Sequence, residues 1–189
     1  MPRQSTPPVF TIGHSTRPFA DFLALLQENG VEEIADVRRL PGSRRWPQYD
    51  QDTLRDALAA HGIGYRHYPA LGGRRGSGTE GSPNGWWEHP AFRRYADYAL
   101  TAPFREGFEA LLAASVERRC AVMCAEAVWW RCHRRILADY LIHAGREVVH
   151  ILGPHHVERA VMTPAARALG GGLVYPGLDL AGDPLDGGG

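Results

Sequence analysis

The chain contains no lysine, so all 21 of its basic residues are arginines. This absence excludes a Schiff-base lysine, a lysine general base and the lysine of a phosphate-binding P-loop. The 21 basic residues are matched by 21 acidic ones, and this balance leaves no overall charge to attract nucleic acid or an anionic membrane. Arginine remains available to hold phosphate or carboxylate groups through paired hydrogen bonds.

Cysteine and long apolar segments are also scarce. The three cysteines, Cys120, Cys124 and Cys132, are too few and too close together for a disulfide framework, so we expect reduced thiols. No apolar run approaches the length of a membrane span, and residues 1–10 lack the apolar core of a signal peptide. The sequence therefore predicts a cytoplasmic protein without a membrane partner.

Short apolar runs alternate with helical spacing along the chain. The pattern predicts strands at residues 9–13, 31–37, 63–68, 120–124 and 147–152, with amphipathic helices between them. This alternation is typical of a Rossmann-like three-layer α/β sandwich with a mainly parallel sheet of about five strands. We predict a single α/β domain over residues 1–181 and a disordered glycine-rich tail over residues 182–189.

Two details of the helices and one long loop are predicted as well. Ser15 or Thr16 is expected to cap the first helix. A later helix that begins near Phe92 is expected to be broken at Pro103 and then to continue. Residues 71–90 are rich in turn-forming residues, and a compact domain usually keeps so long a loop for a functional reason.

Polar side chains follow the predicted strands at the points where the strands end. Because the carboxyl ends of parallel strands share one edge of the sheet, this edge is where open α/β folds bind their ligands. The candidate residues at this edge are, in chain order, His14, Ser15, Asp36, Arg38, residues 71–75, Cys124 and Glu126. We expect these side chains to converge on one site.

The segment 118–150 has the most candidate catalytic residues, and its pattern predicts a strand, a tight loop and a helix. Cys124 ends the strand, and Cys132, His133 and Arg134 open the helix, whose N-terminus favours anions and thiolates. Cys124 is a candidate nucleophile with Glu126 or His133 controlling its proton. The alternative is an inert cysteine in a buried strand. We expect Cys124 and Cys132 to be close in space and at least one of them to be more reactive than Cys120.

Four of these segments together resemble the domain of unknown function 488 family. The resemblance is carried by TIGHS at 11–15, DVRRLPGS at 36–43, YRHYPALGGRR at 65–75 and CAEAVWWRCHRR at 124–135, and it covers roughly residues 9–152. Many members carry Lys-Asp-Pro after the glutamate, whereas Ala127, Val128 and Trp129 follow Glu126 here, as in a branch with a Trp-Trp-Arg-Cys-His-Arg motif. The resemblance implies a Rossmann-like domain and a cytoplasmic bacterial protein, and it implies no particular reaction.

Metal binding is an alternative use of the same residues. Cys124, Cys132, His133 and His14 offer thiolate and imidazole ligands suited to zinc or iron. Paired CxxC spacing is absent, however, and adjacent side chains on one helix, such as Cys132 and His133, point about 100° apart. We therefore predict no metal ligands, and the sequence identifies no cofactor.

Arginines and tryptophans supply the remaining candidates for binding a ligand. Arg38 and Arg134 are the best candidates to hold an anion. Asp36 is expected to buttress Arg38 or a neighbouring histidine rather than act as a general base. Tryptophans 86, 87, 129 and 130 lie in two loops, where they are able to stack on a base or ribose. We expect residues 72–87 to form a mobile cover over the site.

These observations predict an enzyme that acts on a small anionic ligand, phosphorylated or nucleotide-like. The predicted catalytic residues are Cys124, Glu126, Cys132 and His133, and the predicted ligand-binding residues are His14, Ser15, Asp36, Arg38, Arg74, Trp87, Trp130 and Arg134. One alternative is a non-catalytic module that binds nucleic acid through Arg74, Arg75, Trp86 and Trp87. A second alternative is a metal-binding protein.

Overall fold

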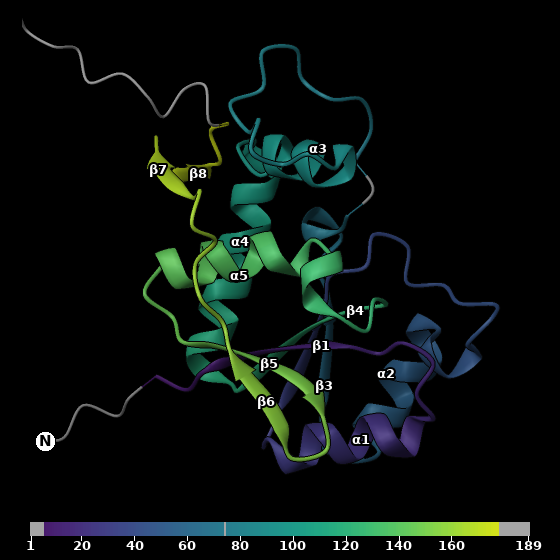
Figure 1. Ribbon diagram of the computed structural model, residues 1–189. Coiled ribbons are helices and arrows are strands. Elements are labelled where there is room, and N and C mark those ends of the chain that lie inside the picture. The colour runs from purple at the N-terminus through teal and green to yellow at the C-terminus, as the bar shows by residue number, and fades with distance from the viewer. Residues whose placement is uncertain (1–5, 74, 178–189) are drawn as a thin grey trace, which may run out of the picture.

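The computed structural model describes residues 6–73 and 75–177, and its centre is a six-stranded sheet (Figure 1). The strand order is β3-β2-β4-β1-β5-β6. Five strands are parallel: β1 (Val9–Gly13), β2 (Glu33–Asp36), β3 (Gly64–His67), β4 (Cys120–Cys124) and β5 (Val148–Gly153). Strand β6 (His156–Arg159) pairs antiparallel with β5 at one edge. The predicted mainly parallel sheet is confirmed.

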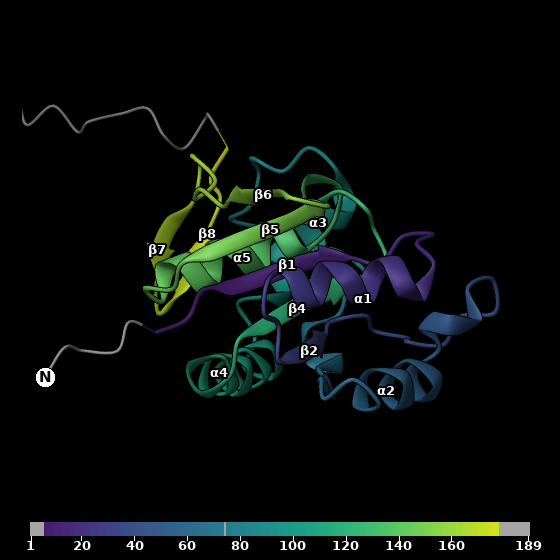
Figure 2. The ribbon, with the colours of Figure 1, turned by 90° about the horizontal axis from the view of Figure 1, so that it is seen from below.

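Helices cover both faces of this sheet. α1 (Phe19–Glu28) and α2 (Gln51–Ala59) lie on one face, while α4 (Ala102–Glu117) and α5 (Arg134–His143) lie on the other with α3 (Pro90–Tyr98) beyond them (Figures 1 and 2). Alternate residues of the strands belong to two separate hydrophobic cores. Ile12 and Met123 pack toward α1 and α2, whereas Val122 packs toward α4 and α5. The three-layer α/β sandwich is therefore confirmed.

Three short strands were absent from the sequence prediction. All residues of β6 are exposed, so no apolar alternation marks it. Strands β7 (Arg167–Leu169) and β8 (Gly172–Val174) form a separate antiparallel hairpin around Gly170 and Gly171, both of which have positive φ. Strands of three residues give too few positions for a period of two to be recognised. The predicted tail at residues 182–189 lies outside the described residues.

The expected interruption of the helix that begins near Phe92 is present, but it lies just before Pro103. α3 ends at Tyr98, and Pro103 sits in the first turn of α4, where a missing backbone N–H costs little. The expected cap of the first helix is wrong. Neither Ser15 nor Thr16 caps α1, because the helix begins after Pro18 and has no side-chain cap. Ser15 instead adopts a left-handed conformation, with φ of 50°, and its backbone N–H donates to the carbonyl of Ala125.

The two central strands, β1 and β4, end side by side at the carboxyl edge. Gly13 pairs with Cys124 in the sheet register, and the chain that leaves β4 crosses directly over the end of β1. A side chain at position 13 would overlap the carbonyl oxygen of Glu126, so the crossing requires glycine there. This close approach brings the loop after β4 onto the residues that follow β1.

Candidate functional site

A cleft of about 950 Å³ opens at the carboxyl edge of the sheet. It collects side chains that follow three parallel strands and precede α5. Of the residues predicted from the sequence, His14, Arg38, Cys124, Glu126, Trp130, Cys132 and His133 line this cleft. The edge where strand order reverses, between β1 and β4, is where doubly wound folds bind ligands.

Two cysteine sulfurs form the floor of the cleft. Sγ of Cys124 and Sγ of Cys132 lie 2.8 Å apart, and both side chains are buried and reduced. The backbone N–H of Arg134, in the first turn of α5, points at Sγ of Cys132 at 3.3 Å. The start of a helix thus directs a hydrogen bond and a partial positive charge onto this sulfur. Cys120 lies at the opposite end of β4 and does not line the cleft.

The guanidinium of Arg134 lies beneath the cysteines rather than on the cleft wall. It is 1 % exposed and donates from Nε to Sγ of Cys124 at 3.0 Å, from NH1 to Oγ1 of Thr11 at 3.2 Å and from NH2 to the carbonyl of Glu126 at 2.7 Å. Each of its three nitrogens therefore donates to an acceptor within the protein. The geometry makes Arg134 a buried counter-ion for the thiols, so the predicted direct contact between its guanidinium and an anionic ligand has no structural support.

The pKa values of the two thiols are shifted in opposite directions. Burial opposes ionisation of Cys132, but the hydrogen bond from Cys124 and the charge of Arg134 outweigh it and lower the pKa of Cys132 to about 7. Burial raises the pKa of Cys124 well above its ordinary value, and the neighbouring Cys132 raises it further. Above about pH 7 the pair is accordingly a thiolate at Cys132 that accepts a hydrogen bond from the thiol of Cys124.

His133 faces the same sulfur through its unprotonated nitrogen. Its Nε2 lies 3.1 Å from the carbonyl of Val37, which only accepts hydrogen bonds, so Nε2 carries the proton and Nδ1 is free of one. Nδ1 lies 3.5 Å from Sγ of Cys132. Burial lowers the pKa of His133, which favours this neutral form. The expected divergence of Cys132 and His133 is wrong, because Cys132 is extended (φ −137°, ψ 156°) and precedes the helix.

A second cluster closes the other side of the cleft. Arg38 donates from Nε and NH2 to the carboxylate of Asp36, the shortest contact being 2.7 Å, and from NH1 to the carbonyl of Tyr49. Asp36 is fully buried behind it and also accepts a hydrogen bond from Tyr65. Asp36 therefore buttresses Arg38 from behind and does not reach the cleft.

His14 lies between this cluster and the cysteines. Its ring stacks on Tyr49 at 4.1 Å, and its Nδ1 donates to the carbonyl of Ser15. Nε2 is left as an acceptor that faces NH1 of Arg38 at 3.5 Å. Burial, with a smaller contribution from Arg38, lowers the pKa of His14 to about 4, so the ring is neutral at pH 7.

The comparisons with known proteins match this region of the chain. A model of the family described as Domain of unknown function DUF488 matches residues 18–141. The chain belongs to the DUF488 family. The match spans α1 to most of α5 and includes the motifs that supply Arg38, Cys124, Cys132 and His133. No curated protein and no solved structure matches the chain.

Sequence reasoning about this DUF488 chain missed two buried polar residues below the site. Thr11 accepts the hydrogen bond from Arg134 and contacts Nδ1 of His150 at 2.6 Å. The available signal was a polar residue within each of two apolar strands, VFTIG and VVHILG. These two side chains extend the hydrogen-bond network from the cysteines across the sheet.

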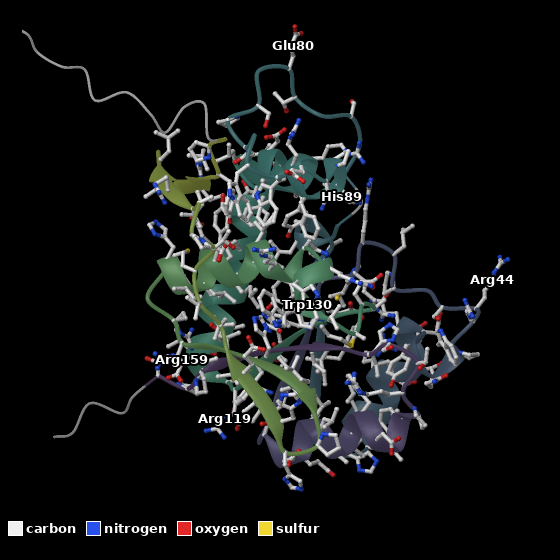
Figure 3. The ribbon with its side chains drawn as sticks, viewed as in Figure 1. Arg44, Glu80, His89, Arg119, Trp130 and Arg159 are labelled. Atoms are coloured by element: carbon white, nitrogen blue, oxygen red, sulfur yellow. The ribbon has the colours of Figure 1, made fainter. Side chains whose placement is uncertain are left out.

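The tryptophans of the DUF488 chain divide between the cleft and the core. Trp130 is 46 % exposed and lines the cleft, and it is labelled in Figure 3. Trp129 stacks on His150 at 4.5 Å. Trp87 is 4 % exposed and packs on Phe92 and Tyr175, so the expectation that it contacts a ligand gains no support from the structure.

The segment 72–87 does not cover the cleft. Within its described part, Gly73 alone lines the cleft, while Arg75, Ser77 and Thr79 line a smaller hollow of about 300 Å³ beside α3. Asn84 donates to Asp97 and accepts from the backbone of Tyr175, which anchors the end of the segment. The hypothesis of a mobile cover is not supported by these contacts. Arg74 lies outside the described residues.

The two alternative functions gain no support from this geometry. The guanidinium of Arg75 lies 3.7 Å from the ring centre of Tyr98 and donates to two backbone carbonyls. This side chain, which was predicted to contact nucleic acid, therefore already interacts with groups of the protein. Over residues 6–73 and 75–177, no three His, Cys, Asp or Glu side chains are gathered in a way that could hold a metal ion. Across the same residues, none of the helices has the length and apolar character needed to span a membrane.

Proposed function

We propose that this DUF488 protein is an enzyme that acts on a small anionic ligand, phosphorylated or nucleotide-like, through the thiolate of Cys132. The observation that carries the proposal is the arrangement around Sγ of Cys132. Sγ of Cys124, the backbone N–H of Arg134 and Nδ1 of His133 all lie within 3.5 Å of it, and the sulfur faces a cleft large enough for a small ligand.

Each residue near the sulfur has a separate role in this proposal. Cys132 replaces Cys124 as the nucleophile, because the helix N-terminus and the hydrogen bond from Cys124 both stabilise negative charge there. His133 accepts a proton at Nδ1 when Cys132 is a thiol. The carboxylate of Glu126 lines the cleft and makes no hydrogen bond or ion pair to the described residues, so it is available to accept a proton from a bound ligand.

The charges in the cleft support an anionic ligand. The charge of Arg38 is compensated by Asp36, and the charge of Arg134 is compensated by the thiolate. Arg39 and Arg131 line the cleft together with Arg38 and the carboxylate of Glu126. Guanidinium groups suit phosphate and carboxylate oxygens. Trp130 presents a partly exposed ring to the same space, where a base or sugar is able to pack.

The proposal predicts that Cys132 prefers an anionic electrophile to a neutral one. We expect iodoacetate to alkylate Cys132 several-fold faster, relative to iodoacetamide, than it alkylates a free thiol, because positive charge in a cleft raises the local anion concentration. AMP should slow the reaction by occupying the cleft. Alkylation rates are followed by mass spectrometry of the Cys132 peptide.

The matched variants remove one arginine at the cleft or one away from it. Arg131→Gln should abolish most of the preference for iodoacetate. Arg159→Gln should leave it unchanged, because Arg159 lies at the end of β6, on the opposite side of the molecule from His89 at the cleft (Figure 3). A preference equal to that of a free thiol, or one lost equally in both variants, would overturn the anionic-ligand proposal.

A further inference from the structure

The second thiol has no required role in attack by Cys132 on a ligand. Cys124 is buried at the end of β4, and its Sγ lies 2.8 Å from Sγ of Cys132. A nucleophile needs only a base and a group that stabilises its negative charge, which His133 and the backbone N–H of Arg134 already provide for Cys132. The separation is much shorter than the non-bonded contact of two sulfur atoms and exceeds the disulfide bond length by less than ~1 Å.

We infer that Cys124 and Cys132 form a redox couple that reduces low-molecular-weight disulfides and is itself converted to an intramolecular disulfide. This activity rests on the same nucleophilic sulfur as the proposed function. It goes beyond that function because it assigns a covalent role to Cys124 and a second class of substrate, R–S–S–R, to the cleft.

The reaction has two exchange steps. The thiolate of Cys132 attacks one sulfur of R–S–S–R, a Cys132–S–S–R bond forms, and the first RS⁻ leaves. Cys124 then loses its proton and attacks Sγ of Cys132, which forms the Cys124–Cys132 disulfide and expels the second RS⁻, and this group takes up the proton. The two protein sulfurs are oxidised, and the small disulfide is reduced to two thiol molecules.

The surroundings of Cys124 suit the second step. Nε of Arg134 lies 3.0 Å from Sγ of Cys124, so a guanidinium stabilises the negative charge that develops when this thiol ionises. Both sulfurs line the cleft, so a mixed disulfide on Cys132 has room for its R group. Cys120, at the other end of the strand and outside the cleft, provides an internal control.

The test uses the anionic aromatic disulfide DTNB, whose released thiolate is coloured. Reduced wild-type protein should release two equivalents of thiolate and retain no adduct, and peptide mapping should find Cys124 linked to Cys132. Cys124→Ser should release one equivalent and retain the adduct on Cys132. Cys120→Ser should behave as wild type, because Cys120 takes no part in either step.

The outcomes separate this inference from the proposed function. If Cys132 is alkylated rapidly by iodoacetate, but wild-type protein keeps a stable DTNB adduct on Cys132, then the redox couple is refuted and the proposed nucleophile stands. If Cys132 reacts with neither reagent, both are refuted. Circular dichroism of Cys124→Ser establishes that the variant is folded, and Cys124→Ala repeats the measurement with a second replacement.

Discussion

Arg134→Met is expected to lower the free energy of unfolding by roughly 3–5 kcal/mol at pH 8, the range for breaking a buried charge pair. Its guanidinium is 1 % exposed and joins β1, β4 and the loop after β4 through Thr11, Cys124 and the carbonyl of Glu126. Methionine fills similar space but leaves these acceptors without a donor and the thiolate without a counter-ion. Urea unfolding, monitored by tryptophan fluorescence, measures the loss.

The control for this variant is Arg131→Met, in the turn just before α5. Arg131 is exposed, so its replacement should change stability by less than about 0.5 kcal/mol. The cost of Arg134→Met should be smaller at pH 6 than at pH 8, because Cys132 is then protonated and no thiolate is left uncompensated. A loss below about 1 kcal/mol at pH 8 would show that Arg134 does not hold the site together.

Stability should fall steeply between pH 6.5 and pH 4 because two buried histidines stay neutral in the native state. Burial, with smaller contributions from Arg38 for His14 and from Arg134 for His150, lowers the pKa of each histidine to about 4. The unfolded chain binds these protons near pH 6.5 and the native state does not, so the stabilisation is complete above pH 6.5 and is lost on acidification. Each histidine accounts for about 3 kcal/mol.

The comparison is the change in unfolding free energy between pH 7 and pH 4.5 for matched variants. His150→Gln should flatten this dependence, whatever its stability at pH 7, because carboxylates contribute equally to variant and wild type. His61→Gln should leave the dependence unchanged, since His61 is exposed at the end of α2. If His150→Gln and wild type lose the same free energy on acidification, His150 is protonated in the native protein.

The sequence predicts the three layers of the fold and the place of the site at the carboxyl edge of the sheet, because both follow from the spacing of apolar residues along the chain. Apolar strands and amphipathic helices alternate, and the parallel order that this implies brings residues 14, 38, 124 and 133 to one edge. The predicted proximity of Cys124 and Cys132 follows from the strand, loop and helix pattern. The strands β6, β7 and β8 were missed because they are exposed or only three residues long.

The sequence does not predict which groups a side chain at the site contacts. Arg134 reads as an anion-binding residue at a helix start, but the loop after β4 folds over it and takes its hydrogen bonds. Trp87 reads as a loop tryptophan, but Phe92 and Tyr175 enclose it, and Tyr175 lies 88 residues along the chain. Thr11 and His150 become part of the network only when β1 and β5 pair. These assignments depend on tertiary contacts.

The most direct test of the account is the pH dependence of alkylation of the three cysteines by iodoacetamide, followed by peptide mapping. Cys132 should be labelled first, with a rate that rises around pH 7, because the pKa of its thiol is lowered to about 7 by the hydrogen bond from Cys124 and by Arg134 despite burial. Cys120 should be labelled slowly, since burial raises the pKa of its thiol to about 11. Fastest labelling of Cys120 or Cys124, or a rate for Cys132 that rises only near the ordinary thiol value of 9.0, would contradict a Cys132 thiolate.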